Sequence, residues 1–200
     1  MKIVVIGATG TIGRRVVEKL QSQHEVVSVG SNSGDYQVDI TSVESIKKMY
    51  EDISNIDAVI SATGGAAFTA LPELSVEENQ IAINSKLLGQ INLVLIGQHY
   101  LNSNGSFTLT SGIMMDDPIR LGSSAAMANG GITGFVTSAA IELNNGLRIN
   151  NVSPNVVEEA LGKYGEFFKG FTAVPVDKVA DAYVKSVEGA QTGQTYRIYN

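Results

Sequence analysis

The sequence predicts an α/β fold in which a doubly wound parallel β-sheet is flanked by helices on both faces, giving three α/β/α layers. Short apolar runs alternate with amphipathic helical segments from end to end, and a glycine-rich turn joins the first run to the first helix. The 200 residues are 44% hydrophobic and contain no internal repeat and no long polar or Pro/Gly/Ser tract. We therefore expect one domain over residues 1–200 that buries a sizeable core.

The first predicted strand, Ile3–Ile6, leads directly into Gly7, Gly10 and Gly13. In such a turn the first glycine allows a tight bend, the second lets backbone N–H groups approach a pyrophosphate, and the third lets the helix pack close to the strand. Apolar residues then recur at helical spacing up to Leu20, and the positive N-terminal end of that helix would face the phosphates. The turn therefore predicts a dinucleotide site. Its predicted cofactor contacts are Gly7, Thr9, Gly10, Thr11, Ile12, Gly13 and Arg14.

The remaining elements follow from the same patterns. Capping boxes at 41–44 and 75–78 open a helix to about Tyr50 and a long helix to about Tyr100. The other expected strands are 25–29, about 37–39, 57–62, 106–110, 148–152 and 195–199, and the other helices are about 124–144 and about 176–188. Residues 155–174 are the only long irregular connection, and they carry three phenylalanines beyond the carboxyl end of a strand. We expect this connection to be a substrate lid or a packed surface loop.

Charge and composition exclude several function classes. The chain has 14 basic and 20 acidic residues, a net charge of -6 and no basic run, so no nucleic-acid partner is expected. No apolar stretch could span a bilayer, and Arg14 and Arg15 follow the first run, unlike in a signal peptide, so we expect a cytoplasmic protein without membrane contact. The absence of cysteine excludes disulfides and thiolate chemistry. His24 and His99 lack metal-ligand spacing, and no metal site is predicted.

Two neighbouring stretches, Thr137–Leu143 and Leu147–Pro154, resemble the helix end and the following Arg-x-Asn-x-Val-Ser-Pro strand of the short-chain dehydrogenase/reductases. The resemblance covers nearly the whole chain, although the chain is shorter than most members and its glycine spacing is that of atypical or extended members. It implies a Rossmann-like doubly wound parallel β-sheet and an NAD(P)-dependent oxidoreductase acting on a small carbonyl or alcohol substrate. The further cofactor contacts that it implies are Asp39, Ile40, Ala62, Thr63, Gly64, Pro154 and Val156.

The catalytic Tyr-x-x-x-Lys pair of that family is missing. Counting back from Glu142 at the matching helix end places the two positions at Ala125 and Asn129. In the family the tyrosine moves the proton, while the lysine lowers the pKa of the tyrosine and holds the nicotinamide ribose, and a methyl and an amide can do neither. The resemblance makes Ser111, at the end of the preceding strand, the substrate-orienting serine. A structural strand-end hydroxyl is the alternative.

Lys86 is the second predicted catalytic residue. The family's fourth active-site residue is an asparagine three residues before a glycine in the long helix, and with Gly89 in the glycine position this residue is Lys86, with Asn84 as the alternative. Asparagine and lysine would thus have exchanged places, since Asn129 stands at the lysine position. The ammonium of Lys86 would then approach the ribose or the substrate from the opposite wall. A solvated helix lysine is the other interpretation.

The end of the second strand indicates the cofactor. An NAD enzyme normally places an acidic residue there to hold the ribose 2′-hydroxyl, but the stretch 30–33 contains no acid. Small hydroxyl and amide donors can accept a 2′-phosphate instead, and Arg14 would add positive charge. We therefore predict NADP rather than NAD, although a solvated Arg14 or an Asp35 that folds back would favour NAD. The predicted contacts are Ser31, Asn32, Ser33 and Arg14.

Two functions are compatible with these residues. The first is an NADP(H)-dependent oxidoreductase in which water, Ser111 or a substrate group handles the proton and Lys86 gives electrostatic help. The alternative is a redox-inactive NADP(H)-binding sensor or regulatory protein, which the missing tyrosine and lysine favour. Isomerase or lyase chemistry has no positive signal in the sequence.

Gly130 and Gly131 lie inside the helix predicted at 124–144, where each glycine costs up to about 1 kcal/mol relative to alanine. A compensating close contact is therefore expected. In the short-chain dehydrogenase/reductases this helix pairs across a two-fold interface, so the resemblance implies a homodimer or homotetramer. Close approach of the two glycines to the cofactor or the sheet is the alternative.

Overall fold

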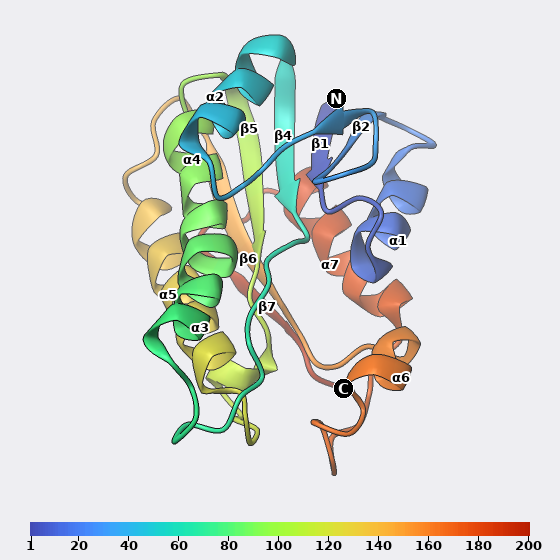
Figure 1. Cartoon of the computed structure of the whole chain (residues 1–200). Helices are drawn as coiled ribbons and strands as arrows, with labels where there is room; N and C mark the ends of the chain where they lie inside the picture. The colour runs from blue at the N-terminus through green and yellow to red at the C-terminus, as the bar shows by residue number, and fades with distance from the viewer.

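Seven strands form one parallel sheet in the computed structural model, which describes residues 1–200 (Figure 1). The strands are β1 (Lys2–Ile6), β2 (Glu25–Gly30), β3 (Tyr36–Gln37), β4 (Ile56–Ser61), β5 (Leu101–Thr110), β6 (Arg148–Pro154) and β7 (Thr195–Ile198). Their spatial order is β3-β2-β1-β4-β5-β6-β7, and every neighbouring pair is parallel. The strand order reverses between β1 and β4, which opens a crevice at the carboxyl ends of these strands. The predicted doubly wound α/β fold is confirmed.

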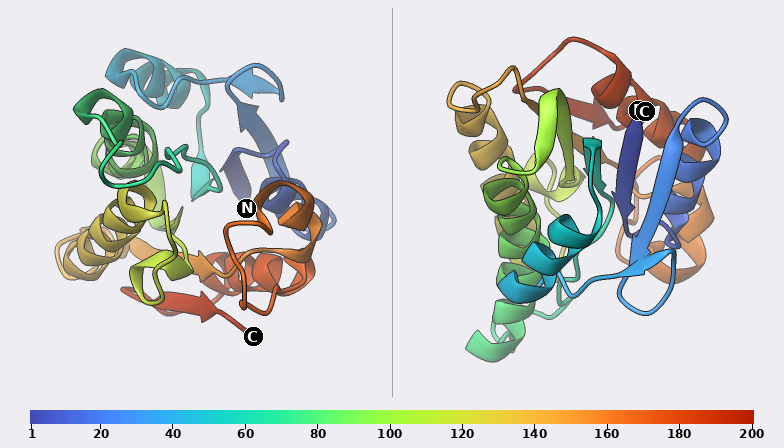
Figure 2. Two further views of the ribbon diagram at one scale, coloured as in Figure 1. Left: turned by 60° about the horizontal axis from the view of Figure 1, so that its bottom comes forward. Right: turned by 90° about the horizontal axis from the view of Figure 1, so that it is seen from above.

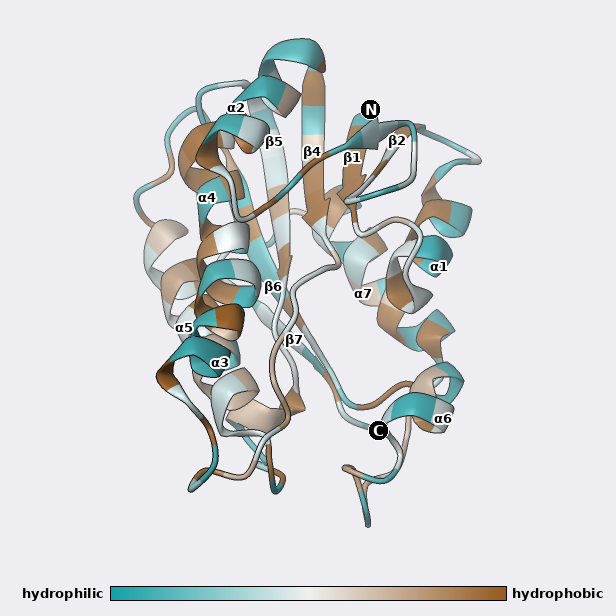
Figure 3. Ribbon diagram, viewed as in Figure 1, coloured by the Kyte–Doolittle hydropathy of each residue, from teal (hydrophilic) through white to brown (hydrophobic).

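Helices cover both faces of the sheet. They are α1 (Thr11–Leu20), α2 (Val43–Asp52), α3 (Val76–Ile81), α4 (Gln90–Gly97), α5 (Ser123–Ala139), α6 (Leu161–Tyr164) and α7 (Val176–Glu188). On one face α2, α4 and α5 bury Met49, Leu93 and Ile132, and on the other α1 and α7 bury Leu20 and Tyr183 (Figure 1). Figure 3 shows mainly hydrophobic residues along β1 and β4, whereas the outer helices alternate between hydrophobic and hydrophilic residues. None of the helices is both long and apolar enough to cross a membrane.

The two predicted capping boxes differ in outcome. At α3 the box forms, because Ser75 Oγ accepts from the Glu78 N–H at 3.0 Å and Glu78 Oε2 accepts from the Ser75 N–H at 3.1 Å. At α2 the box predicted from Thr41 is wrong by one residue. The N-cap is Ser42, whose Oγ accepts from the Ser45 N–H at 3.2 Å. Thr41 donates its hydroxyl to Asp39 instead.

The long helix predicted from residue 76 to about residue 100 is interrupted. A π-helical segment, Ala82–Gly89, separates α3 from α4, and α4 ends at Gly97. In a π-helix each N–H donates five residues back, so the turn is wider than an α-helical turn. Two close contacts position this segment: a Cβ added to Gly64 would lie 2.8 Å from Lys86 Cα, and one added to Gly89 would lie 3.0 Å from the Ile40 side chain. Both contacts join distant parts of the chain and leave no local pattern in the sequence.

The helix predicted at 124–144 ends earlier, at Ala139. Beyond it, the N–H groups of Ile141 and Glu142 donate three residues back, which tightens the chain into a turn. The turn leaves Ile141 86% exposed and lets Leu143 pack against the core. The boundaries of the strands shift as well, since β3 begins before the predicted residue 37 and β5 before the predicted residue 106.

The interior glycines of α5 have different surroundings. A Cβ added to Gly131 would lie 2.8 Å from Leu87 Cδ1, so α5 packs closely against the π-helical segment at this residue. A Cβ added to Gly130 or Gly134 would meet no atom within 4 Å. The expected helix–helix contact therefore forms within the chain at Gly131, and the other two glycines face open space.

Two irregular segments lie at the carboxyl edge of the sheet, so the prediction of a single long connection at 155–174 is wrong. Residues 62–75, after β4, are also irregular, while 155–174 contains α6 and a short 3₁₀ turn. The Phe68 ring lies 5.9 Å from the Tyr164 ring and 4.9 Å from the Phe167 ring, measured between centroids. The two segments are thus in contact across the carboxyl ends of the strands, which Figure 2 (left) shows from that side.

Candidate functional site

The glycine turn between β1 and α1 is shaped by close backbone contacts. Gly7 has φ +83°, and a Cβ added to it would lie 2.5 Å from the Ala62 carbonyl oxygen. A Cβ added to Gly13 would overlap the Gly7 carbonyl oxygen. A Cβ added to Gly10 would lie 3.3 Å from the same oxygen, so Gly10 has room for a side chain. The first and third glycines are therefore required by packing alone, while the second keeps the backbone accessible.

The N-terminus of α1 has free backbone donors. Gly10 is the N-cap and makes no side-chain capping bond, and the first turn contains no acidic residue. The first intrahelical bond runs from the Arg14 N–H to the Gly10 carbonyl, so the N–H groups of Thr11, Ile12 and Gly13 have no intrahelical acceptor. Such an end attracts an anion through its N–H groups and the helix dipole.

Two cavities lie along the carboxyl edge of the sheet. The first, of about 550 Å³, lies beside the glycine turn and the end of β2, and the second, of about 320 Å³, lies between the ends of β4, β5 and β6 and the 155–174 segment. Both are lined by Ala62 and Thr63, so they form one elongated site. Of the predicted residues, the first cavity is also lined by Gly7, Thr9, Gly10, Ser31, Asn32, Asp39 and Ile40, and the second by Thr11, Ile12, Gly64, Lys86, Ser111, Pro154 and Val156.

Three predicted cofactor residues line neither cavity. Gly13 is buried against the turn, as described above. Ser33 lies just outside the first cavity, where its Oγ donates to Thr9 Oγ1 at 3.3 Å. Arg14 is exposed, and its guanidinium donates to the Thr9 carbonyl at 3.3 Å. The structure therefore brings Ser31 and Asn32 to the first cavity without a basic side chain in its lining.

Carboxylates near the first cavity are held by hydroxyl and amide donors. Asp35 does fold back, but onto β2, where its carboxylate accepts from the Ser28 N–H at 2.9 Å and the Ser28 Oγ at 2.8 Å. These two bonds lower the pKa of Asp35. Asp39 lines the cavity, and bonds from the hydroxyl and N–H of Thr41 lower its pKa. No acid of β2 itself lines the cavity.

Ser111 follows the last residue of β5 and lines the second cavity, where it is 3% exposed. Its N–H donates to the Val152 carbonyl and to Asn151 Oδ1, each at 3.0 Å. Its Oγ accepts from Asn151 Nδ2 at 2.7 Å. Three hydrogen bonds to the neighbouring strand β6 therefore fix this serine at the cavity wall.

Lys86 reaches the second cavity from the π-helical segment. It is half-buried, and its Nζ has neither a hydrogen-bond nor an ion-pair partner in the protein. Burial lowers the pKa of Lys86 from an ordinary 10.5 to about 8. Asn84, the alternative residue, is exposed and bonds to Gln80. The structure thus brings Lys86 to the cavity and leaves Asn84 at the surface.

Ala125 and Asn129 lie side by side on α5 at the wall of the second cavity, and both are buried. Neither Nδ2 nor Oδ1 of Asn129 has a hydrogen-bond partner in the protein. The close neighbour is Gly112, where an added Cβ would lie 3.2 Å from Nδ2. An unpaired buried carboxamide is costly, so this side chain is suited to a polar ligand group. No group of three or more His, Asp or Glu side chains is arranged to hold a metal ion.

Gln90 is a residue that sequence reasoning missed. It is fully buried at the start of α4, and its Nε2 donates to the carbonyls of Lys86 and Thr110 at 2.9 Å each. Its Oε1 accepts from the Thr110 N–H at 2.8 Å. Gln90 therefore joins the turn that carries Lys86 to the strand end that carries Ser111. The signal in the sequence was a glutamine inside the largely apolar stretch 87–96, which also contains Asn92.

The sheet order, the glycine turn and the elongated site together define a Rossmann-type α/β protein. The family described as enoyl-(acyl carrier protein) reductase matches residues 2–185. The chain belongs to the short-chain dehydrogenase/reductase family, which confirms the resemblance found in the sequence.

Several solved structures are similar to this chain. The protein lin1944 from Listeria innocua is 58% identical, with a TM-score of 0.98 and complete coverage of both chains. A small-chain dehydrogenase in complex with NADPH is 24% identical over 99% of this chain and 96% of that one, with a TM-score of 0.89. The ligand-free aldohexose dehydrogenase of Thermoplasma acidophilum is 18% identical over 98% and 91%, with a TM-score of 0.88. No curated protein sequence matches the chain.

Proposed function

We propose that this protein is an NADP(H)-dependent oxidoreductase that interconverts a small carbonyl compound and its alcohol. The observation that carries the proposal is the elongated site, in which two cavities meet at Ala62 and Thr63 beside an uncapped helix N-terminus. A cavity pair of this kind suits a dinucleotide bound across the point where the strand order reverses. The NADPH complex of the small-chain dehydrogenase, which has the same fold, supports the choice of cofactor.

The residues present fit such a cofactor. The turn around Gly10 and the free N–H groups of α1 would hold the pyrophosphate, and the first cavity would hold the adenosine end with Ser31, Asn32 and Asp39. In the second cavity the unpaired carboxamide of Asn129 would bond to the nicotinamide half. When bound, the nicotinamide supplies or accepts the hydride. The choice of NADP over NAD rests on the missing acid at the end of β2, since Arg14 lies outside the cavity lining.

Ser111 and Lys86 carry the chemistry in this proposal. Ala125 and Asn129 occupy the positions of the family's tyrosine and lysine, so proton transfer falls to Ser111, a substrate group or water. The ammonium of Lys86, which lines the same cavity, stabilises negative charge on the substrate or holds the ribose. Phe68, Tyr164 and Phe168 close the cavity on the side of the two irregular segments.

A redox-inactive NADP(H) sensor is the second candidate. The observation that favours it is Ala125, which is buried in the cavity wall and places a methyl group where a proton donor would act. Positioned acid catalysis typically contributes about 10²- to 10⁴-fold to a rate, so its loss could leave binding without turnover.

A homodimer or homotetramer completes the proposal. Leu88, Leu95 and Met127 are large apolar side chains that are each more than 40% exposed. On α5, the spacing of Met127, Gly130 and Gly134 places all three on one helix face, and the glycines have open space beside them. A second copy of the chain would bury this face.

Cofactor titration and a carbonyl screen test the proposed function. We expect NADPH to bind more tightly than NADH and to be oxidised with at least one aldehyde or ketone from a panel of aliphatic, aromatic and sugar carbonyls. Tight NADPH binding without turnover across the panel would favour the sensor, and a preference for NADH would overturn the cofactor assignment.

Replacing Ser111 tests its catalytic role. Ser111→Ala is expected to lower kcat at least about tenfold with an unchanged dissociation constant for NADPH, because the hydroxyl acts on the substrate. Ser106→Ala is the matched control, since Ser106 is also buried in β5 but lines neither cavity. Equal activity of the wild type and Ser111→Ala would remove Ser111 from the mechanism.

A further inference from the structure

Asn151 is a fully buried asparagine of β6 whose side chain contacts Ser111. The strands β5 and β6 pair with Leu109 opposite Asn151, which brings this side chain beside the end of β5. Its Oδ1 accepts from the Ser111 N–H at 3.0 Å, and its Nδ2 donates to Ser111 Oγ at 2.7 Å. Asn151 therefore contacts both the main chain and the hydroxyl of Ser111, which lines the second cavity.

These partners determine the orientation of the carboxamide. A backbone N–H can only donate, so the atom that faces the Ser111 N–H is the carbonyl oxygen, and the other atom is the amide nitrogen. The amide nitrogen can also only donate, so Ser111 Oγ accepts from it. The second hydrogen of Asn151 Nδ2 is directed to Thr133 Oγ1 at 3.1 Å, closer than Thr195 Oγ1 at 3.5 Å. Both hydrogens of the amide are thus in use.

The hydroxyl hydrogen of Ser111 is left for the cavity. It cannot be donated to the Asn151 amide nitrogen, and the structure contains no other protein acceptor for it. We propose that Asn151 is a positioning residue that keeps the Ser111 hydroxyl oriented as a hydrogen-bond donor toward the oxygen of a carbonyl substrate. The inference rests on the proposed function, in which that oxygen gains negative charge during reduction.

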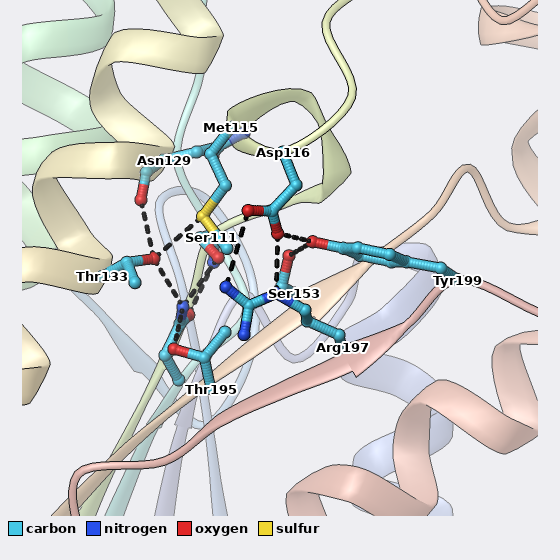
Figure 4. A network of polar contacts seen from close by, with 10 residues as sticks. Ser111, Met115, Asp116, Asn129, Thr133, Ser153, Thr195, Arg197 and Tyr199 are labelled. Atoms are coloured by element: carbon cyan, nitrogen blue, oxygen red, sulfur yellow. Dashed lines mark hydrogen bonds and ion pairs between the residues drawn. The ribbon is translucent and has the colours of Figure 1, made fainter.

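Three elements hold this donor in place. Asn151 belongs to β6, Ser111 follows β5, and Thr133 belongs to α5. Thr133 Oγ1 in turn lies 3.1 Å from the Asn129 carbonyl oxygen and 2.9 Å from Met115 Sδ (Figure 4). Because the donor is already fixed by packed neighbours, it needs no reorganisation when charge develops on the substrate.

A double-mutant cycle tests whether Asn151 acts through Ser111. With NADPH and the best carbonyl of the panel above, Asn151→Ala is expected to lower kcat about tenfold and to change KM and the NADPH dissociation constant less than about twofold. In the Ser111→Ala background the same substitution is expected to change kcat less than about twofold. An equal loss of kcat in both backgrounds would show a merely structural role and overturn the proposal.

Asn150→Ala is the matched control for this cycle. Asn150 is equally buried in the same strand, but its Nδ2 donates to Ser186 Oγ and to the Gln191 carbonyl, away from Ser111. We expect this variant to lose thermal stability as Asn151→Ala does while it keeps kcat within about twofold of the wild type. A tenfold loss of kcat in Asn150→Ala would contradict a specific role for Asn151.

Neutron diffraction from deuterated crystals tests the orientation without any substrate. The expected map shows the Ser111 hydroxyl deuterium pointing into the second cavity and the two Asn151 amide deuterons pointing to Ser111 and Thr133. A Ser111 deuterium directed at the Asn151 side chain would overturn the inference. This readout is the same whether or not a carbonyl is turned over, so failure of the proposed function and failure of the inference are distinguishable.

Discussion

At Lys86, burial disfavours the charged form of the side chain. Its amine lines the second cavity from the π-helical segment and has no ion-pair partner in the protein, and burial lowers its pKa to about 8. A lysine with such a pKa changes charge close to neutral pH, which few lysines do. The same side chain therefore affects both the chemistry proposed for the cavity and the stability of the fold, with opposite dependences on pH.

Activity is expected to fall as the pH rises through about 8, because the ammonium that stabilises developing negative charge is then lost. The measurement is kcat/KM against pH with NADPH and the carbonyl found in the screen. In Lys86→Met the decline near pH 8 is expected to disappear along with most of the activity. A decline that persists unchanged in this variant would assign it to another group.

Stability is expected to show the opposite trend. The pKa of Lys86 is about 8 in the folded protein and 10.5 when unperturbed, so between these values the unfolded chain binds more protons. The cost of burying the charge is fully present below about pH 8 and is relieved as the pH rises toward 10.5. Urea denaturation at about pH 7 and at about pH 10 checks this. From the lower to the higher pH, the free energy of unfolding of the wild type is expected to rise relative to that of Lys86→Met. An equal pH dependence in both proteins would contradict it.

The glycine turn gives a second test at the residue scale. Gly13→Ala would place a methyl group on the Gly7 carbonyl oxygen and is expected to destabilise the fold by about 1–3 kcal/mol. Gly10→Ala is the matched control, because its φ of -73° suits alanine and its Cβ would lie 3.3 Å from the same oxygen. Thermal denaturation should show a clearly lower Tm for Gly13→Ala, and equal Tm values would contradict the packing argument.

At the scale of elements, Gln90 connects the two walls of the second cavity. Its three hydrogen bonds join the last turn of the π-helical segment to the end of β5, and the group is fully buried. Such a side chain holds Lys86 and Ser111 at a fixed separation although it contacts neither functional group. The geometry of the site therefore depends on one amide that does not line the cavity.

Gln90→Leu is expected to destabilise the protein by about 3 kcal/mol, because the substitution removes three buried hydrogen bonds, to the Thr110 N–H and to two backbone carbonyls. Gln98→Leu is the matched control, since the Gln98 side chain makes only one hydrogen bond, an exposed one to the Leu95 carbonyl, and the loss of this bond should cost less than about 0.5 kcal/mol. Urea denaturation measures both. A smaller loss of stability in Gln90→Leu than in Gln98→Leu would contradict the structural role of Gln90.

The elements also show what sequence could and could not predict. Apolar runs and the capping residue Ser75 predicted the strands and the start of α3, because both depend on neighbours within a few residues. The π-helical segment, the role of Gln90 and the bond between Asn151 and Ser111 were not predicted. Each depends on the register of segments that lie far apart in the chain. The placement of Lys86 at the cavity was predicted only through the family resemblance.

For the whole molecule, the parallel sheet with its reversal between β1 and β4 places every predicted functional segment at one edge. The opposite edge carries none of them. Leu88, Leu95 and Met127 line neither cavity, and their apolar side chains remain exposed in the single chain. They are the side chains that a second copy, as proposed above, would cover.

Sedimentation equilibrium at micromolar concentration is expected to give a dimer or tetramer mass for the wild type. Leu95→Glu is expected to shift the mass toward the monomer, because a charge on this face would be desolvated in the interface. Ile141→Glu is the matched control, since Ile141 is 86% exposed but lies beyond the end of α5. A monomeric wild type would exclude the oligomer.

The wide turn at Ala82–Gly89 also has a consequence for how such a protein can evolve. Successive residues of an α-helix are rotated by about 100° about its axis, and those of a wider π-helical turn by less. The deletion of one codon between residues 87 and 89 would therefore swing the lysine out of the cavity while α4 kept its packing. Insertions and deletions here, as well as substitutions of Lys86 itself, would then decide whether a descendant keeps an amine at this wall. A change in chain length by a single residue would act as a change of active-site chemistry.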